Sequence, residues 1–403
     1  MSDADVAVVG GGPAGAAAAT LLARAGRDVV LVDKARFPRD KTCGDGLTAA
    51  ALRELEDLGL APDSVAGWQP VGTVHLRSPS GRVVDLPLPT GPDAGLFAVV
   101  APRLTLDAAV LDLARSAGAK VLDGHGVRSA DVVDGGSAVA LEVEGLGSVR
   151  AGHVVAADGA WSPLRKMLGV ARAGYLGDWH AFRQYFAGCG PAAADLWVWF
   201  DADLIPGYMW SFPLPGGRAN VGFGLQRNEE FDAHHMGELW PRLLQRSHVR
   251  EVLGPYARPE APHRAWPIPA RVREAPLTAA GGRVLFAGDA AWATDPLTGE
   301  GIAQALLSGR RAAEAVLAGE PGVGRRYQSA VGKDLFADHW LGSLLGRGLS
   351  HRKGARLAIR AAGLNGWTQR NFARWLFEDY PRAVLGTPRR WSRGMFTAPG
   401  AYR

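Results

Sequence analysis

A glycine-rich segment near the N-terminus has the residue types and spacing of a phosphate-binding turn. Residues 10–15 read GGGPAG, which matches the pattern G-x-G-x-x-G, and Asp33 ends the next predicted strand. In such a turn Gly10 permits a tight bend, Gly12 lets the backbone approach a pyrophosphate, and Gly15 lets the following helix pack on the strand. The helix N-terminus offers free N–H groups to phosphates, and the carboxylate accepts hydrogen bonds from a ribose hydroxyl. These residues predict a dinucleotide-binding site.

Two later segments indicate which dinucleotide is bound. Residues 156–163 read AADGAWSP and residues 284–291 read VLFAGDAA, so each ends a short apolar run with an aspartate beside a glycine. Residues 295–302 (DPLTGEGI) then lead into a predicted helix. Taken singly, these aspartates could be helix N-caps or turn residues. The combination with the first motif resembles the para-hydroxybenzoate-hydroxylase-like FAD-dependent oxidoreductases.

This resemblance implies a bound FAD and a set of contacts to it. Asp289 would bond the ribityl chain, and residues 299–302 would lie against the pyrimidine side of the flavin. A helix starting at Glu300 would direct its N-terminal amides at flavin N1 and O2, where negative charge collects on reduction. Lys34 and the backbone at Val127 would lie near the adenosine half. The predicted cofactor-binding residues are Gly10, Gly12, Ala14, Gly15, Asp33, Lys34, Arg103, Val127, Asp158, Gly288, Asp289, Gly299, Gly301 and Ile302.

Two further segments resemble the geranylgeranyl reductase family within that group. Residues 37–47 (FPRDKTCGDGL) look like a loop of this family, and residues 206–213 (PGYMWSFP) contain its Tyr-x-Trp-x-Phe-Pro element. A lysine often follows this element, whereas Leu214 stands here, which leaves the exact substrate open. Members of the family reduce isolated double bonds in prenyl chains, including those of lipids and quinones.

Three residues of these segments are predicted to be catalytic: Cys43, Tyr208 and Trp210. Tyr208 and Trp210 are two positions apart on a predicted strand, so both side chains point to one face. They could wall an apolar tunnel over the flavin, or they could be core aromatics of a sheet. The family folds the Cys43 loop near the flavin ring, where a thiol could protonate the product. Equally, Cys43 could be a small residue tolerated in a tight loop.

The elements that position these residues predict an α/β fold with a discontinuous layout. Buried strands are predicted at residues 5–10, 28–33 and 283–287, and helices at residues 13–26, 48–58, 104–117 and 300–317. Residues 71–100 are predicted to form hairpins of another sheet, and further strands are predicted within residues 120–155 and 182–225. The predicted parts are a Rossmann-type FAD-binding domain (1–70, 98–175 and 275–330), an inserted antiparallel-sheet substrate domain (71–97 and 176–274) and a helical C-terminal region (331–403).

Composition limits the remaining classes of function. The chain has 403 residues and only two cysteines, Cys43 and Cys189, which excludes a disulfide framework and favours a reducing cytoplasm. Its ten histidines show no grouping with metal-ligand spacing, so no metal site is predicted. No run of about 18 apolar residues is present, so no membrane-spanning segment is predicted.

The last part of the chain is strongly basic. Residues 347–403 contain twelve lysines and arginines against two acids, Glu378 and Asp379. This segment could be an amphipathic surface that rests on anionic lipid, or a helical cap on the substrate domain with a solvated outer face. Since no nucleic-acid-binding motif accompanies the charge, nucleic acid is not an expected partner. The basic residues are interleaved with Leu349, Leu357, Ile359, Leu364, Trp367 and Phe372.

Three hypotheses of function remain open at this point. The first is an FAD-dependent reductase of a carbon–carbon double bond in a large apolar, isoprenoid-like molecule, with Cys43, Tyr208 or water as proton donor. The second is a flavin-dependent monooxygenase that hydroxylates or epoxidises a similar substrate. The third is a flavin-binding carrier without catalysis. No second nucleotide-binding motif is visible, so NAD(P)H would visit the flavin transiently or a ferredoxin-like protein would reduce it.

Overall fold

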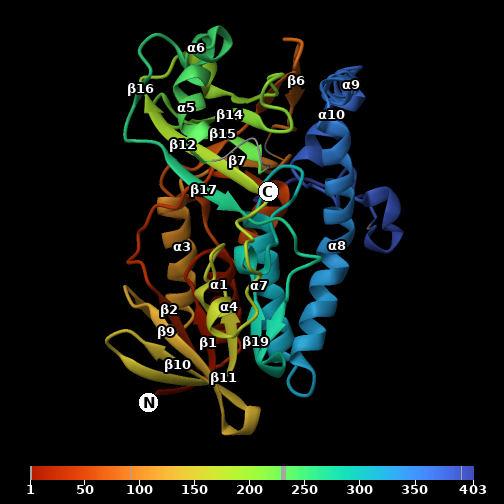
Figure 1. The fold of residues 1–403 in the computed structure, drawn as a ribbon. Helices are drawn as coiled ribbons and strands as arrows, with labels where there is room; N and C mark the ends of the chain where they lie inside the picture. The colour runs from red at the N-terminus through yellow and green to blue at the C-terminus, as the bar shows by residue number, and fades with distance from the viewer. Residues whose placement is uncertain (1, 92, 228–232, 392) are drawn as a thin grey trace.

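A sheet built around the N-terminal strand occupies the lower half of the molecule in Figure 1. Strand β1 (Ser2–Val9) pairs in parallel with β2 (Val29–Asp33) on one side and with β11 (Gly147–Ala156) on the other. Outside these, β8 (Lys120–Asp123) pairs with β2 and β19 (Val284–Phe286) pairs with β11, both in parallel. The computed structural model describes residues 2–91, 93–227, 233–391 and 393–403.

Small residues let helices pack closely on this sheet. The alanine-rich helix α1 (Pro13–Arg24) is buried along most of its length and lies between α3 (Arg103–Ser116) and α7 (Ile302–Leu317) (Figure 1). A Cβ at Gly309 of α7 would lie 2.1 Å from the carbonyl oxygen of Ala14, so only glycine permits this crossing. The sheet is completed by β9 (Val127–Val133), β10 (Ala138–Val143) and β18 (Thr278–Ala279).

A second sheet forms the upper half of the molecule (Figure 1). Its strands run in the order β16 (Arg258–Pro259), β12 (Trp179–Ala187), β15 (Arg218–Gln226), β14 (Tyr208–Leu214), β13 (Leu196–Trp199), β5 (Thr73–Arg77) and β6 (Val83–Pro87). Strand β17 (Arg264–Ile268) also pairs with β12. The predicted antiparallel sheet is confirmed, with one exception, since β13 and β5 are parallel.

One part of the strand prediction is wrong. Residues 71–100 do not all join the second sheet, because β7 (Ala98–Val100) pairs with β3 (Gly46–Thr48) and β4 (Gln69–Pro70) in a separate small sheet. All three residues of β7 are buried, so their apolar run carries no sign of which sheet they enter. The domain boundaries themselves remain a prediction. Further helices before the C-terminal region are α2 (Ala49–Asp57), α4 (Pro163–Met167), α5 (Ala233–Leu244) and α6 (Ser247–Leu253).

The C-terminal region is helical, as predicted, and contacts both halves of the molecule. Helix α8 (Val323–Leu349) runs along one side in Figure 1, and α9 (Arg352–Ala362) and α10 (Gly366–Leu376) pack on β6. After Leu376 the chain forms only short 3₁₀ turns among the described residues, and Ala401 pairs with Leu96. Within the described residues no helix is both long and apolar enough to cross a bilayer.

Candidate functional site

One cavity of about 620 Å³ connects the carboxyl ends of the parallel strands with the second sheet. Every predicted cofactor-binding and catalytic residue except Gly15 lines it. Gly15 lies behind the turn, where a Cβ would come within 1.8 Å of the carbonyl oxygen of Gly10. The fold therefore brings motif residues that are far apart in the sequence, such as Gly12 and Ile302, to one site.

The nucleotide end of the cavity fits a dinucleotide phosphate. Gly12 caps α1 without any side-chain hydrogen bond, which leaves the amides of the first turn free to bind an anion. Gly10 has a φ of +107°, and a Cβ there would lie 2.2 Å from the carbonyl oxygen of Ala157, so no other residue fits this turn. Asp33 ends β2 and accepts a hydrogen bond of 2.6 Å from the amide of Gly11. Donors, space and carboxylate together suit the phosphates and ribose of FAD.

The two aspartates of the later motifs have different partners. Asp289 accepts a bond of 2.8 Å from the ammonium of Lys41. Burial alone would raise the pKa of Asp289, but Lys41 holds this pKa below its usual range, so the carboxylate stays ionised. Asp158 accepts hydrogen bonds from Ser162 and from the amide of Leu164, at 2.7 and 2.9 Å, and so also caps helix α4.

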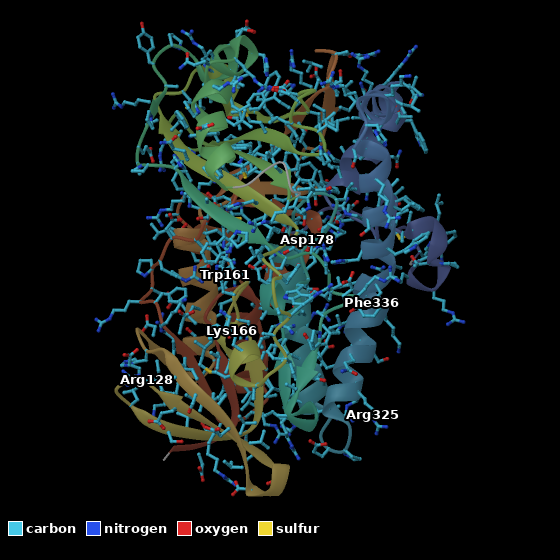
Figure 2. The ribbon with its side chains drawn as sticks, in the orientation of Figure 1. Arg128, Trp161, Lys166, Asp178, Arg325 and Phe336 are labelled. Carbon is cyan, nitrogen blue, oxygen red and sulfur yellow. The ribbon has the colours of Figure 1, made fainter. Side chains whose placement is uncertain are left out.

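The loop of Asp158 extends along the cavity wall. Trp161, which lines the cavity and is 45% exposed, and Lys166 of α4 mark this region near the middle of the molecule in Figure 2. Burial raises the pKa of Asp158, which disfavours its charge unless a bound partner donates to it. Asp158 therefore accepts hydrogen bonds at the start of α4, as a helix cap would, and its side chain also lines the cavity.

The helix expected to start at Glu300 begins two residues later, at Ile302. The Glu300 carboxylate folds back and accepts from the amides of Ile302 and Ala303, at 2.9 and 3.4 Å. It thus occupies amides that the sequence had assigned to the flavin. Burial raises the pKa of Glu300 to about 7, so this side chain carries an exchangeable proton in the cavity wall near neutral pH.

Residues 37–47 form a loop that is held at several points between the two sheets. Arg39 pairs with Asp107 of α3 at 2.9 Å, and Asp40 pairs with Arg183 of β12 at 2.6 Å. The ion pair between Lys41 and Asp289 adds a third attachment. Because each partner belongs to a different element, the loop has a defined position over the cavity.

Cys43 lies in this loop with its thiol half-buried at the cavity wall. Its sulfur accepts from the amide of Asp45 at 3.3 Å, and its carbonyl oxygen accepts from the side chain of Asn220 at 2.8 Å. Burial raises the pKa of the Cys43 thiol, and the nearby guanidinium of Arg103 opposes this effect only in part. The group is therefore a protonated thiol at neutral pH, able to donate a proton.

Asp45 joins the loop to the second sheet and was not predicted as a site residue. Its backbone has a φ of +67°, and its buried carboxylate accepts from the hydroxyl of Tyr185 at 2.6 Å and from Asn220 at 2.8 Å. The amide of Arg103 donates to the other carboxylate oxygen at 3.3 Å. Burial raises the pKa of Asp45 to about 6. Tyr185 and Asn220 gave no sequence signal, since their contacts lie 140 and 175 positions away.

Tyr208 and Trp210 lie on β14 with their ring centroids 5.9 Å apart, on the cavity side. The Trp210 ring donates to Asn220 at 3.2 Å. The hydroxyl of Tyr208 donates to the carbonyl oxygen of Thr298, so its proton is directed at the backbone rather than at a substrate. Space for the Trp210 ring depends on Gly222 of β15, where a Cβ would lie 2.3 Å from that ring. Glycine inside a strand is a signal of such close approach that the sequence analysis missed.

The far end of the cavity is apolar. Strands β5 and β13 and the C-terminal helices contribute hydrocarbon and aromatic side chains there: Val74, Leu76, Leu196, Val198, Phe200, Leu349, Trp375 and Leu376. The C-terminal region also fixes the loop before α7, because buried Arg382 pairs with Asp295 and donates to Thr298 Oγ1 at 3.2 Å. Such a compartment can hold a long hydrocarbon chain beside the nucleotide end.

Known proteins share both sequence and fold with this chain. The family described as FAD binding domain matches residues 3–309. A menaquinone reductase from Mycolicibacterium smegmatis is 37% identical over 78% of this chain and 77% of its own length. Digeranylgeranylglycerophospholipid reductase 1 from Methanopyrus kandleri is 32% identical over 77% of this chain and 79% of its own length. A geranylgeranyl bacteriochlorophyll reductase-like protein from Thermoplasma acidophilum has a similar fold, with a TM-score of 0.79 at 22% identity, covering 97% of this chain and 100% of that one.

Proposed function

Because the chain belongs to the geranylgeranyl reductase family of FAD-dependent oxidoreductases, we propose that it reduces a carbon–carbon double bond in the isoprenoid chain of a quinone or lipid. The observation that carries this proposal is the continuity of the cavity, whose nucleotide end and apolar end share one space. The names of the two relatives contain menaquinone and a digeranylgeranyl lipid. Both compounds carry long isoprenoid chains. An apolar chain of this kind matches the lining from β5, β13 and the C-terminal helices.

Reduction of the double bond adds a hydride to one carbon and a proton to the other. Reduced FAD, when bound, would supply the hydride, and the chain's own residues would position the substrate and supply the proton. The Cys43 thiol is the proposed proton donor, because it is protonated at neutral pH and lines the cavity. Tyr208 is assigned to the wall instead, since its hydroxyl proton is bound to the Thr298 carbonyl. Trp210 shapes the same wall.

The thiol needs a proton source after each turnover. Asp45, whose amide donates to the Cys43 sulfur, has a pKa of about 6, and its carboxylate accepts a hydrogen bond from the hydroxyl of Tyr185. Glu300, with a pKa of about 7, lies in the same cavity wall. The electrons come from NAD(P)H or a ferredoxin-like protein in this proposal, and either donor would act on the flavin between turnovers.

The test uses the FAD-loaded protein, reduced chemically and kept free of oxygen. A geranylgeranyl lipid is added, and the products are identified by mass, because a quinone ring could itself take electrons without any change in the chain. The proposal expects a gain of two hydrogens for each double bond reduced, and no product from the fully saturated lipid. A product that contains a new oxygen atom, formed only in air, would instead assign the protein as a monooxygenase.

A further inference from the structure

Helices α9 and α10 carry positive charge without acidic residues. Between Asp338 and Glu378 the chain contains seven lysines and arginines and no aspartate or glutamate. Arg352 donates to the carbonyl oxygen of Ala202 at 3.1 Å. Four other cations are exposed and form no ion pair with the described part of the chain: Lys353, Arg356, Arg360 and Arg370. Their charges face solvent uncompensated.

Large apolar side chains lie among these cations. Leu357, Leu364 and Trp367 are 69%, 67% and 67% exposed, whereas side chains of these types are usually buried. On α9 the positions 353, 356, 357 and 360 follow the spacing i, i+3, i+4, i+7, so charge and hydrocarbon share one stripe. We call the exposed side of α9 and α10 the basic face. It consists of Lys353, Arg356, Leu357, Arg360, Leu364, Trp367 and Arg370.

The opposite side of the same helices is packed and fixed. Ala355, Ile359 and Ala362 of α9 are buried. At the turn into α10, a Cβ on Gly363 would lie 2.8 Å from Val84 of β6, so the backbone is in close contact with the second sheet. The basic face is therefore held in a defined orientation, outward from the body of the protein.

We propose that the basic face rests on the surface of an anionic lipid bilayer. A set of cations without any acid is complementary to anionic headgroups. Tryptophan and leucine between those cations suit the boundary of headgroups and acyl chains, where apolar side chains leave water. A nucleic acid would meet the same charges but would leave Leu357, Leu364 and Trp367 in water. The chemistry of the face therefore fits a lipid surface best.

Helix α10 of the basic face and the end of the neighbouring helix α8 also line the apolar end of the cavity. Leu349, at the end of α8, and Trp375 and Leu376, at the end of α10, belong to the cavity wall. A bilayer seated on α9 and α10 would place its hydrocarbon next to the compartment proposed for an isoprenoid chain. The lipid contact itself does not depend on the proposed reaction, because it is measured without substrate or turnover.

The test is sedimentation of the FAD-loaded protein with vesicles of equal parts phosphatidylcholine and phosphatidylglycerol. The double variant Arg356→Gln/Arg360→Gln should bind these vesicles roughly 30-fold more weakly, about five-fold for each charge near an anionic surface. The matched control is Arg128→Gln/Arg325→Gln, which removes the same charge from the opposite end of the molecule, where Figure 2 shows both residues. Retained flavin absorbance shows that each variant is folded.

A second pair of variants tests the apolar part of the face. Trp367→Ser should weaken vesicle binding by about ten-fold or more, whereas Tyr256→Ser, at a residue 84% exposed between α6 and β16, should not. Equal binding of the charge variant and its control would overturn the proposal. The proposal would also be overturned if the parent protein bound the mixed vesicles no more strongly than vesicles of phosphatidylcholine alone. Binding to duplex DNA in preference to vesicles would also overturn it.

Discussion

Replacing Asp45 by asparagine should change how the stability of the protein depends on pH. The Asp45 carboxylate is fully buried and accepts hydrogen bonds from Tyr185 and Asn220. Burial raises its pKa from 3.8 to about 6. Ionising this group therefore costs free energy in the folded protein that it does not cost in the unfolded chain.

The sign and size of the effect follow from linkage between protonation and folding. A carboxyl group whose pKa is raised on folding stabilises the protein at low pH, and this stabilisation is lost as the pH rises through the folded pKa. Asparagine does not titrate. Between about pH 7 and about pH 5, the free energy of unfolding of the parent should gain roughly 1.3 kcal/mol relative to Asp45→Asn, because one pKa unit corresponds to about 1.4 kcal/mol.

The assay is urea unfolding of the FAD-loaded parent and variant at both pH values, followed by tryptophan fluorescence. Asp93→Asn is the control, because the Asp93 side chain is 91% exposed and should show no such change. Curves of stability against pH that stay parallel for the parent and Asp45→Asn would refute a raised pKa at this position. If the free energy of unfolding of Asp45→Asn rose relative to that of the parent as the pH fell, the predicted direction of the effect would be refuted.

Three other substitutions probe the site. Gly10→Ala should reduce FAD affinity at least ten-fold, since a strained φ costs about 1–3 kcal/mol and its Cβ would meet a carbonyl oxygen at 2.2 Å; FAD titration measures this. Lys41→Met should make the protein release FAD in mild acid, because burial then raises the pKa of Asp289 with only Arg103 and Thr294 to oppose it; the fluorescence of free FAD reports it. Arg382→Met should destabilise the protein by about 3–5 kcal/mol, because buried Asp295 loses its cation; urea unfolding measures the loss.

Matched controls exist for these three changes. Gly237→Ala adds a Cβ with nothing within 4 Å, so FAD affinity should stay unchanged. Lys166→Met removes an exposed lysine, labelled in Figure 2, and should retain FAD in mild acid. Arg389→Met removes an exposed arginine of the C-terminal region and should leave the free energy of unfolding nearly constant. A control that behaves like its partner would contradict the corresponding argument.

The local part of the fold could be predicted from the sequence because its signals are short in range. The first strand, turn, helix and second strand occupy adjacent residues, and glycine positions alone specify the turn around Gly10. The sequence predicts the start of α7 two residues too early. A glutamate such as Glu300 is equally compatible with the first turn of a helix and with a position that caps it. The partner strand of β7 was missed because three buried apolar residues carry no alternation.

The contacts that complete the site could not be predicted, since they join residues far apart in the chain. Asp45 meets Asn220 across 175 positions, and Arg382 meets Asp295 across 87. The arginines of the C-terminal region show the same limit. In sequence they look alike, yet Arg374 is buried and pairs with Asp379, whereas Arg370 is exposed. Only the tertiary fold separates these two roles.

The most direct test of the proposed reduction is an oxygen-free single turnover of the prereduced, FAD-loaded protein with an isoprenoid lipid. The absorbance of oxidised flavin should return on mixing with the unsaturated lipid, and a saturated lipid of equal length should have no effect. The return should be slower in Cys43→Ala, by about a hundred-fold if the thiol acts as general acid. Flavin that stays reduced with the unsaturated lipid and is oxidised only when air is admitted would show that the protein does not reduce the double bond.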